Sequence, residues 1–142
     1  MKLITFDEGR VGRLEGDDVI ELDVPSTREY FERGGAVGET GERLRLQDVR
    51  LRAPIHPKKF FHTAGNFASH HEELTAVNWS HPVHKGIVFF QNVDAIIGPD
   101  DDIVYPATLT KELDYELELA VVIVAVGRSG ADHVEAAVGE HV

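Results

Sequence analysis

The sequence predicts an α+β protein that is mostly β, with short strands and few helices. Short runs of β-branched and aromatic residues alternate with turns rich in Gly, Asp and Pro, a pattern typical of small antiparallel sheets. The pattern changes near residue 50, where a segment containing two prolines follows the first strands. A length of 142 residues and this change predict a small N-terminal β domain over residues 1–50 and the first part of a second domain over residues 51–142.

The first 50 residues predict a meander of strands followed by one helix. Runs of β-forming residues bounded by Gly, Asp and Glu predict strands over residues 2–6, 11–14 and 19–22. The run Pro-Ser-Thr at residues 25–27 offers an N-cap for a helix near residues 28–33. The glycine-rich residues 34–41 are expected to be irregular.

The second part of the chain alternates strands with longer loops. Its β-forming runs predict strands over residues 59–63, 87–90, 103–105 and 113–126. The last of these carries the strongest strand signal, and its apolar residues 120–124 predict a central position in a sheet. Asn66 is expected to cap a helix over residues 67–77, and another helix is expected to begin at Asp132.

The charge and composition exclude several classes of partner and site. Lys and Arg number 14 against 25 Asp and Glu, a net charge of −11, which would repel nucleic acids and anionic membranes. The absence of cysteine excludes disulfides, thiolate metal sites and cysteine nucleophiles. The first residues are not expected to form a secretory signal, and the apolar run 119–126 is too short to span a bilayer. We expect a soluble, cytoplasmic protein.

An acidic run provides the first candidate site. In a strand, Asp114, Glu116 and Glu118 share one face, and the Cα atoms of successive members lie about 6.6–7 Å apart. Two such carboxylates can bind one hard cation, such as Mg²⁺, Mn²⁺ or Ca²⁺. The alternative is a half-exposed strand with a solvated acidic face, which the pattern by itself favours. The apolar continuation over residues 120–124 argues for the cation, because acids at the edge of a buried strand need a partner.

The expected helix over residues 67–77 provides the second candidate site. His70 and Glu73 are three residues apart and would be neighbours on one helix face. A carboxylate beside an imidazole orients it and raises its basicity, which suits a general base that activates water. The alternative is an exposed pair on a helix surface, and the spacing by itself favours that alternative.

Three segments, in order, resemble one family. Residues 59–70, with Gly65, Asn66 and His70, resemble a strand followed by a Gly-x-Asn-Tyr-x-x-His helix start. Residues 89–92 and 97–103 resemble a substrate-side segment, and residues 113–123 are similar to an Asp-Tyr-Glu-x-Glu-Leu metal strand. The family is that of fumarylacetoacetate hydrolase, which includes acylpyruvases, oxaloacetate decarboxylases and enzymes of homoprotocatechuate breakdown. The opening segment looks like the small N-terminal β domain that many members carry.

The resemblance implies a fold, a reaction class and roles for particular residues. The second domain would be the first part of a fumarylacetoacetase-like mixed β-roll, dimeric when complete. Glu116 and Glu118, with an aspartate further on, would bind Mg²⁺ or Mn²⁺, with Ca²⁺ as an alternative. His70 with Glu73 would be catalytic, and Gln91 and Asn92 would contact substrate. The enzyme would be a metal-dependent hydrolase or lyase acting on C–C bonds of 2-oxo or β-diketo acids, such as acylpyruvate, oxaloacetate or intermediates of aromatic compound catabolism.

Several departures from the family pattern leave a second hypothesis open. Phe67 replaces the usual tyrosine, Gln91 stands where many members have lysine, and the segment that supplies the third metal ligand is not found. The alternative is a non-catalytic truncated remnant or an interaction module, and we expect little keto-acid cleavage by this chain alone. The sequence leaves open which keto acid is used and whether hydrolysis, decarboxylation or isomerisation takes place.

Overall fold

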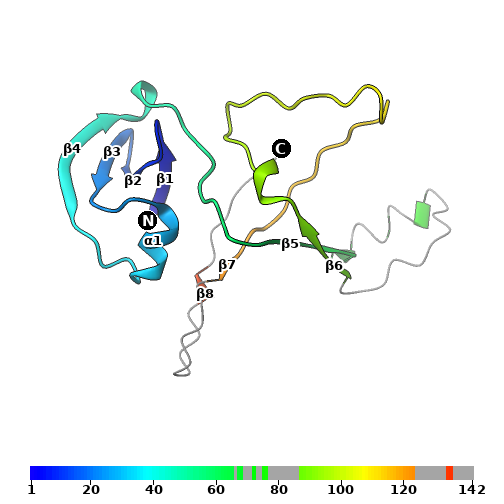
Figure 1. Cartoon of the computed structure of the whole chain (residues 1–142), viewed down its shortest axis with the longest axis horizontal. Coiled ribbons are helices and arrows are strands. Elements are labelled where there is room, and N and C mark those ends of the chain that lie inside the picture. Colours follow the sequence, from blue (N-terminus) through cyan, green and yellow to red (C-terminus); the bar gives the residue numbers. More distant parts are fainter. Residues whose placement is uncertain (66, 69–71, 73–74, 77–86, 124–133, 136–142) are drawn as a thin grey trace. The chain divides into compact units, whose positions relative to one another are not determined.

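The computed structural model describes residues 1–65, 67–68, 72, 75–76, 87–123 and 134–135 (Figure 1). The chain divides into two compact units, one made of residues 1–56 with 97–142 and the other of residues 57–96. The protein is α+β and mostly β, with small antiparallel sheets, which confirms the predicted fold class. The boundary expected near residue 50 stays a prediction.

The N-terminal sheet contains four antiparallel strands in the order β1-β2-β3-β4 (Figure 1). Its strands are β1 (Lys2–Phe6), β2 (Arg10–Glu15), β3 (Asp18–Leu22) and β4 (Glu39–Arg45). The first three are the strands that the turn signals predict, each within one residue at its ends. They form as predicted because alternating apolar residues and tight turns specify a hairpin meander locally.

The helix α1 (Thr27–Glu32) follows β3 and also confirms the sequence expectation. The Oγ of Ser26 accepts a hydrogen bond of 3.1 Å from the backbone N–H of Glu29, so Ser26 is the N-cap. Thr27 and Tyr30 are the buried residues of this helix, and Tyr30 belongs to the core.

Strand β4 corrects the expectation that residues 34–41 are irregular. It begins at Glu39, pairs with β3 through Val19 opposite Leu44, and continues into the 3-10 turn η1 (Leu46–Asp48). All of its residues are exposed except the half-buried Leu44, so it has no apolar alternation by which a sequence pattern could reveal it. Pairing with β3 makes it a strand.

One buried cluster of the N-terminal sheet includes Tyr30 of α1 and contains Val11, Leu22 and Val24. The other buried apolar residues are Phe6, Val19, Ile20 and Ala53. Gly12 follows Val11 on β2 and faces the opposite side of the strand, where a Cβ built on it would lie 2.5 Å from Cγ1 of Val19 and 3.1 Å from Cε1 of Phe6. The absence of a side chain at Gly12 therefore lets β2 and β3 pack at their observed distance.

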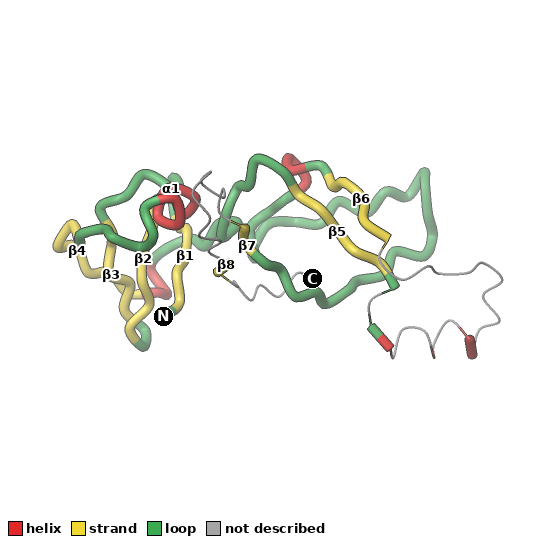
Figure 2. The backbone as a smooth tube through the Cα atoms, turned by 90° about the horizontal axis from the view of Figure 1, so that it is seen from below, coloured by secondary structure: helices red, strands yellow, loops and turns green. Residues whose placement is uncertain are grey.

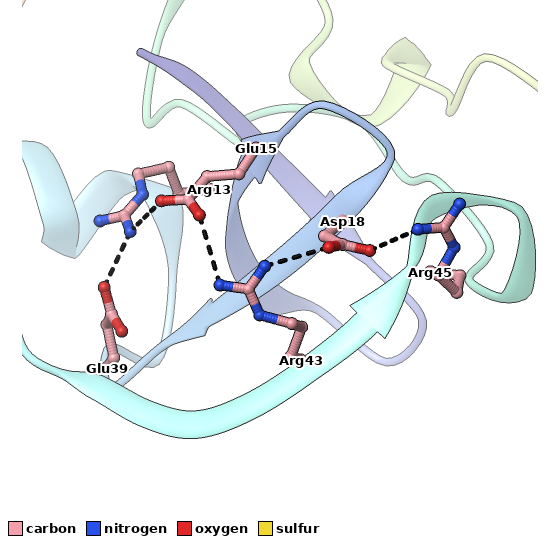
Figure 3. Close-up of polar contacts among 6 residues, drawn as sticks. All are labelled: Arg13, Glu15, Asp18, Glu39, Arg43 and Arg45. Atoms are coloured by element: carbon pink, nitrogen blue, oxygen red, sulfur yellow. Dashed lines mark hydrogen bonds and ion pairs between the residues drawn. The ribbon is translucent and has the colours of Figure 1, made fainter.

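A ladder of alternating charges crosses β2, β3 and β4 (Figure 3). Its links join Glu39 to Arg13, Arg13 to Glu15, Glu15 to Arg43, Arg43 to Asp18, and Asp18 to Arg45. Each of the three arginines in the ladder therefore has a carboxylate partner in its own strand or in another strand of the sheet. Because these carboxylates balance the arginine charges, the ladder does not offer a basic surface to anions.

The unit of residues 57–96 contains an antiparallel hairpin of β5 (Phe60–Ala64) and β6 (Ile87–Gln91). Both strands confirm the sequence predictions, with a one-residue shift of β5 and a one-residue extension of β6. In the expected helix of residues 67–77, four described residues are helical: Ala68, Glu72, Thr75 and Ala76. Asn66, its expected cap, lies outside the described residues. A 3-10 turn, η2 (Val93–Ala95), follows β6.

The long strand expected over residues 113–126 is wrong over most of its length. Residues 111–121 form no strand, and only β7 (Val122–Ile123) pairs, with β8 (Val134–Glu135) (Figure 2). The short strand expected over residues 103–105 is also loop. A strand exists only where a second strand accepts its hydrogen bonds, and no described strand lies beside residues 103–121.

The prediction of a helix that begins at Asp132 is wrong for Val134–Glu135, because these residues form β8. The rest of that range lies outside the described residues. Among the helical residues that the structure describes, none belongs to a helix long and apolar enough to cross a bilayer.

Candidate metal and catalytic site

Glu116 and Glu118 lie on an open stretch of chain that leads into β7. Exposure alternates with period two here: Leu117, Leu119 and Val121 are exposed, whereas Glu118 and Ala120 are half-buried. This alternation, which covers residues 117–123, is that of extended backbone. That the carboxylates of Glu116 and Glu118 share one side of the chain stays a prediction, because Glu116 precedes the alternating residues. Glu116 itself is exposed.

The exposure of Glu116 removes one argument for a metal. That argument is that acids at the edge of a buried strand need a partner. Residues 113–119 instead lie in a loop, and the apolar side chains of this loop are largely exposed, with Leu117 69% exposed. An exposed carboxylate is hydrated by water and needs no ion to balance it. The case for a cation therefore rests on the donor chemistry.

The donor chemistry fits a hard cation. Neither Glu116 nor Glu118 makes a hydrogen bond or ion pair with another described residue. Asp114 differs, because its Oδ1 accepts a hydrogen bond of 2.9 Å from the backbone N–H of Tyr115. Two free carboxylates match the oxygen ligands that Mg²⁺ and Mn²⁺ take. The described residues contain no group of three or more His, Asp or Glu that would complete a protein-only site.

The expected catalytic pair, His70 and Glu73, lies outside the described residues. The helical state of Ala68, Glu72 and Thr75 in the same range agrees with the helix on which the pair was predicted. The geometry of the imidazole and carboxylate themselves stays a prediction.

Gln91 and Asn92 stand at the end of β6, and both are exposed. The Oδ1 of Asn92 accepts a hydrogen bond of 3.1 Å from the backbone N–H of Asp94 and so caps η2. The side-chain amide nitrogen of Asn92 remains as a donor. The side chain of Gln91 makes no hydrogen bond with another described residue, so its whole amide is open to a ligand.

His62 is a candidate that the sequence reasoning did not single out. On β5 it lies opposite Phe89 of β6, with the two rings stacked at 5.4 Å, and its ring also meets that of Phe60 at 4.6 Å. Its Nε2 is buried and has no hydrogen-bond partner among the described residues. A buried polar atom without a partner marks a position worth testing for function. The sequence offers one sign of this position: His62 lies two residues after Phe60 and so shares its strand face.

The predicted site residues fall in both compact units. Gln91 and Asn92 belong to the unit of residues 57–96, as does His62, which the sequence did not single out, and Glu116 and Glu118 belong to the other unit.

Comparison with known proteins decides the family. Residues 59–142 match the family description "Fumarylacetoacetate (FAA) hydrolase C-terminal", and residues 1–54 match "Rv2993c-like, N-terminal". The first match alone covers more than half of the chain. The protein belongs to the fumarylacetoacetate hydrolase family. The resemblance inferred from the three sequence segments is thereby confirmed.

Curated members of the fumarylacetoacetate hydrolase family match this chain over part of their length. A fumarylacetoacetate hydrolase domain-containing protein 2 homolog of Dictyostelium discoideum is 36% identical over 81 residues, 57% of this chain and 25% of that protein. Protein Rv2993c of Mycobacterium tuberculosis is 34% identical over 125 residues, 80% of this chain and 45% of that protein. Oxaloacetate tautomerase FAHD2A, mitochondrial, of Bos taurus is 32% identical over 129 residues, 83% of this chain and 39% of that protein.

The chain thus spans between a quarter and a half of the length of these relatives. No solved structure matches it. The family generally uses a divalent metal ion.

Proposed function

We propose that this chain carries part of the active site of a divalent-metal-dependent enzyme acting on 2-oxo or β-diketo acids. Family membership supports the enzyme class, and the two open carboxylates of Glu116 and Glu118 support the metal. The observation that carries the proposal is that both carboxylates lie within the matched residues 59–142 and make no hydrogen bond or ion pair with another described residue.

Mg²⁺ or Mn²⁺ would be held by Glu116 and Glu118, with Ca²⁺ as an alternative. When bound, such an ion polarises the oxygens of a dioxo group and stabilises negative charge that develops on them. The carboxylates contribute two of the oxygen ligands that such an ion takes, and Mg²⁺ keeps several waters in sites of this kind. Removing either carboxylate should therefore weaken binding strongly.

His70 is proposed as the general base and Glu73 as the residue that orients its ring. The base would take a proton from water or from the carbon next to the substrate carbonyl. Gln91 and Asn92 are proposed as substrate contacts, since amide groups can donate to a carboxylate of the keto acid. The side chain of Gln91 is uncharged, so its hydrogen bond to a carboxylate would be weaker than the one that a lysine makes.

Oxaloacetate is the first substrate to test, because a relative is named an oxaloacetate tautomerase. Keto–enol tautomerisation and C–C cleavage both pass through an enol or enolate. The same metal and base can therefore serve either reaction. We propose that the complete enzyme is a homodimer.

The test follows oxaloacetate and acetylpyruvate by ultraviolet absorbance, with Mn²⁺, with Mg²⁺ and with EDTA. Two proteins are assayed: the 142-residue chain, and a chimera in which it replaces the matching part of the Mycobacterium tuberculosis relative. We expect metal-dependent turnover by the chimera that Glu116→Gln with Glu118→Gln abolishes. A folded, Mn²⁺-binding chimera without turnover of either acid would contradict the proposed substrate class.

The alternative function is a non-catalytic interaction module. The observation that favours it is the open apolar surface of residues 103–123, where Val104 is 86% and Tyr115 76% exposed. A chimera that binds no Mn²⁺ and turns over neither acid would favour this alternative.

A further inference from the structure

A turn after η2 lies against the segment that leaves the N-terminal sheet. The carboxylate of Asp101 accepts a hydrogen bond of 2.6 Å from Nη2 of Arg50 on one oxygen and a hydrogen bond of 2.8 Å from the backbone N–H of Gly98 on the other. The backbone N–H of Asp101 donates to the carbonyl of Gly98 at 3.1 Å. One carboxylate therefore closes the turn of residues 98–101 and joins it to Arg50.

Gly98 provides a second, independent contact. It is buried, and a Cβ built on it would lie 3.2 Å from the Cα of Arg52 and 3.2 Å from the carbonyl oxygen of Leu51. Both neighbours are backbone atoms, which cannot rotate away as a side chain can. The backbone of the turn therefore lies against the backbone of residues 51–52 at a position where the Cβ of a larger residue would be crowded.

The other side of this contact is fixed to β1. Asp7 and Arg50 exchange two hydrogen bonds, from the backbone N–H of Asp7 to the carbonyl of Arg50 at 2.8 Å and from the backbone N–H of Arg50 to Oδ1 of Asp7 at 2.9 Å. The backbone N–H of Arg52 donates to the carbonyl of Thr5 at 2.9 Å. These hydrogen bonds fix the backbone of residues 50–52 beside the end of β1, and the side chain of Arg50 then contacts Asp101.

The contact joins the two parts that the family comparison distinguishes. Residues 50–52 belong to the N-terminal match of residues 1–54, and residues 98–101 belong to the fumarylacetoacetate hydrolase match of residues 59–142. We infer that the N-terminal domain anchors the turn of residues 98–101, a segment of the hydrolase match, through a clasp of Arg50, Gly98 and Asp101. The clasped turn lies on the chain between the Gln91–Asn92 segment and the residues Glu116 and Glu118.

The charges around Asp101 agree with the clasp. The hydrogen bond from the backbone N–H of Gly98 lowers the pKa of Asp101, and Arg50 and Arg52 lower it further. The carboxylate is therefore ionised at neutral pH, where both of its hydrogen bonds are charge-assisted. The side chain of Asp101 is 30% exposed, against 55% for that of Arg50, so the acid is the more buried partner.

The test is hydrogen–deuterium exchange of the full chain at neutral pH. The variants are Arg50→Met, Asp101→Asn and the double variant. Asp100→Asn is the matched control, because the carboxylate of Asp100 makes no contact with another described residue. We expect exchange in residues 98–102 to rise roughly 5- to 30-fold in each single variant, the range for losing one modest interaction. The double variant should match the single ones, since both remove the same bond.

Two further variants separate the clasp from a general loss of stability. Arg50→Lys, which keeps the positive charge, should restore part of the protection, and Gly98→Ala should raise exchange in residues 98–102 by its backbone clash. Exchange of the core residues Val11 and Val19 should stay unchanged in all of them. Unchanged exchange in Arg50→Met and Asp101→Asn, or fully additive effects in the double variant, would overturn the inference. The readout needs no substrate, so a lack of enzyme activity would contradict the proposed function without touching the clasp.

Discussion

Gly12 on β2 lies so close to Val19 on β3 that a Cβ added to the glycine would stand 2.5 Å from the Cγ1 of the valine. Val19 is fully buried and Phe6 closes the other side, so the added methyl group has nowhere to go. The relationship sets how closely β2 and β3 can pack, and a single substitution tests it.

We expect Gly12→Ala to lower the free energy of unfolding by about 1–3 kcal/mol, the usual effect of overpacking a core. The measurement is urea unfolding followed by circular dichroism. Gly38→Ala is the matched control, because nothing lies within 4 Å of a Cβ at that position. Equal stability of the two variants would contradict the packing of β2 on β3.

The acid dependence of stability should depend on Asp18. Hydrogen bonds from Arg43 and then Arg45 lower the pKa of Asp18 in the folded state. A depressed carboxyl pKa adds stability above the unfolded pKa, and that stability is lost as pH falls through the folded pKa. We therefore expect the free energy of unfolding to fall below about pH 4. Asp18→Asn should reduce this fall and lower stability at pH 7.

Urea unfolding between pH 2 and pH 7 measures the effect. Asp23→Asn is the control, since the side chain of Asp23 makes no ion pair with another described residue. The difference between Asp18→Asn and the unsubstituted chain should shrink at 1 M salt, because the ladder is exposed and screened. A difference that is independent of both pH and salt would show that Asp18 acts by packing.

Metal binding should depend on Glu116 and Glu118 together. We expect weak binding of Mn²⁺ and weaker binding of Mg²⁺ by the chain, because two carboxylates leave most of the coordination shell to water. Titration calorimetry of Glu116→Ala with Glu118→Ala should show no binding, whereas Glu112→Gln should bind like the unsubstituted chain. Tight binding that survives the double substitution would place the metal elsewhere.

His70 and His71 should differ in their effect on turnover. In a catalytically complete protein, such as the chimera, His70→Ala should lower kcat by ~10²–10⁴-fold, the range for a positioned general base. His71→Ala should have a smaller effect, because adjacent residues on a helix point about 100° apart. Steady-state kinetics with oxaloacetate measures both. Equal and small effects would contradict a catalytic role and support the alternative, an exposed pair on a helix surface.

Local patterns determined much of the fold. Strands β1, β2 and β3 and helix α1 follow from turns, an N-cap and runs of β-forming residues that lie near one another in sequence. Strands β5 and β6 also follow from their β-forming runs, whereas their pairing joins segments more than 20 residues apart. The family also follows from sequence, because its three motifs occur in order and carry side chains whose chemistry is specific. Glu116 and Glu118 could be proposed as ligands for the same reason.

Only the tertiary structure decided the features that need a partner distant in sequence. β4 is polar on nearly every side chain and becomes a strand through its pairing with β3. Residues 113–121 have the composition of a strand and yet form none, because backbone hydrogen bonds require a second strand at the right distance. The close approaches at Gly12 and Gly98 and the bond between Arg50 and Asp101, 51 residues apart, likewise arise only when separate segments meet. A sequence specifies which groups are present, and the folded chain decides which of them come within the 3 Å at which a hydrogen bond forms.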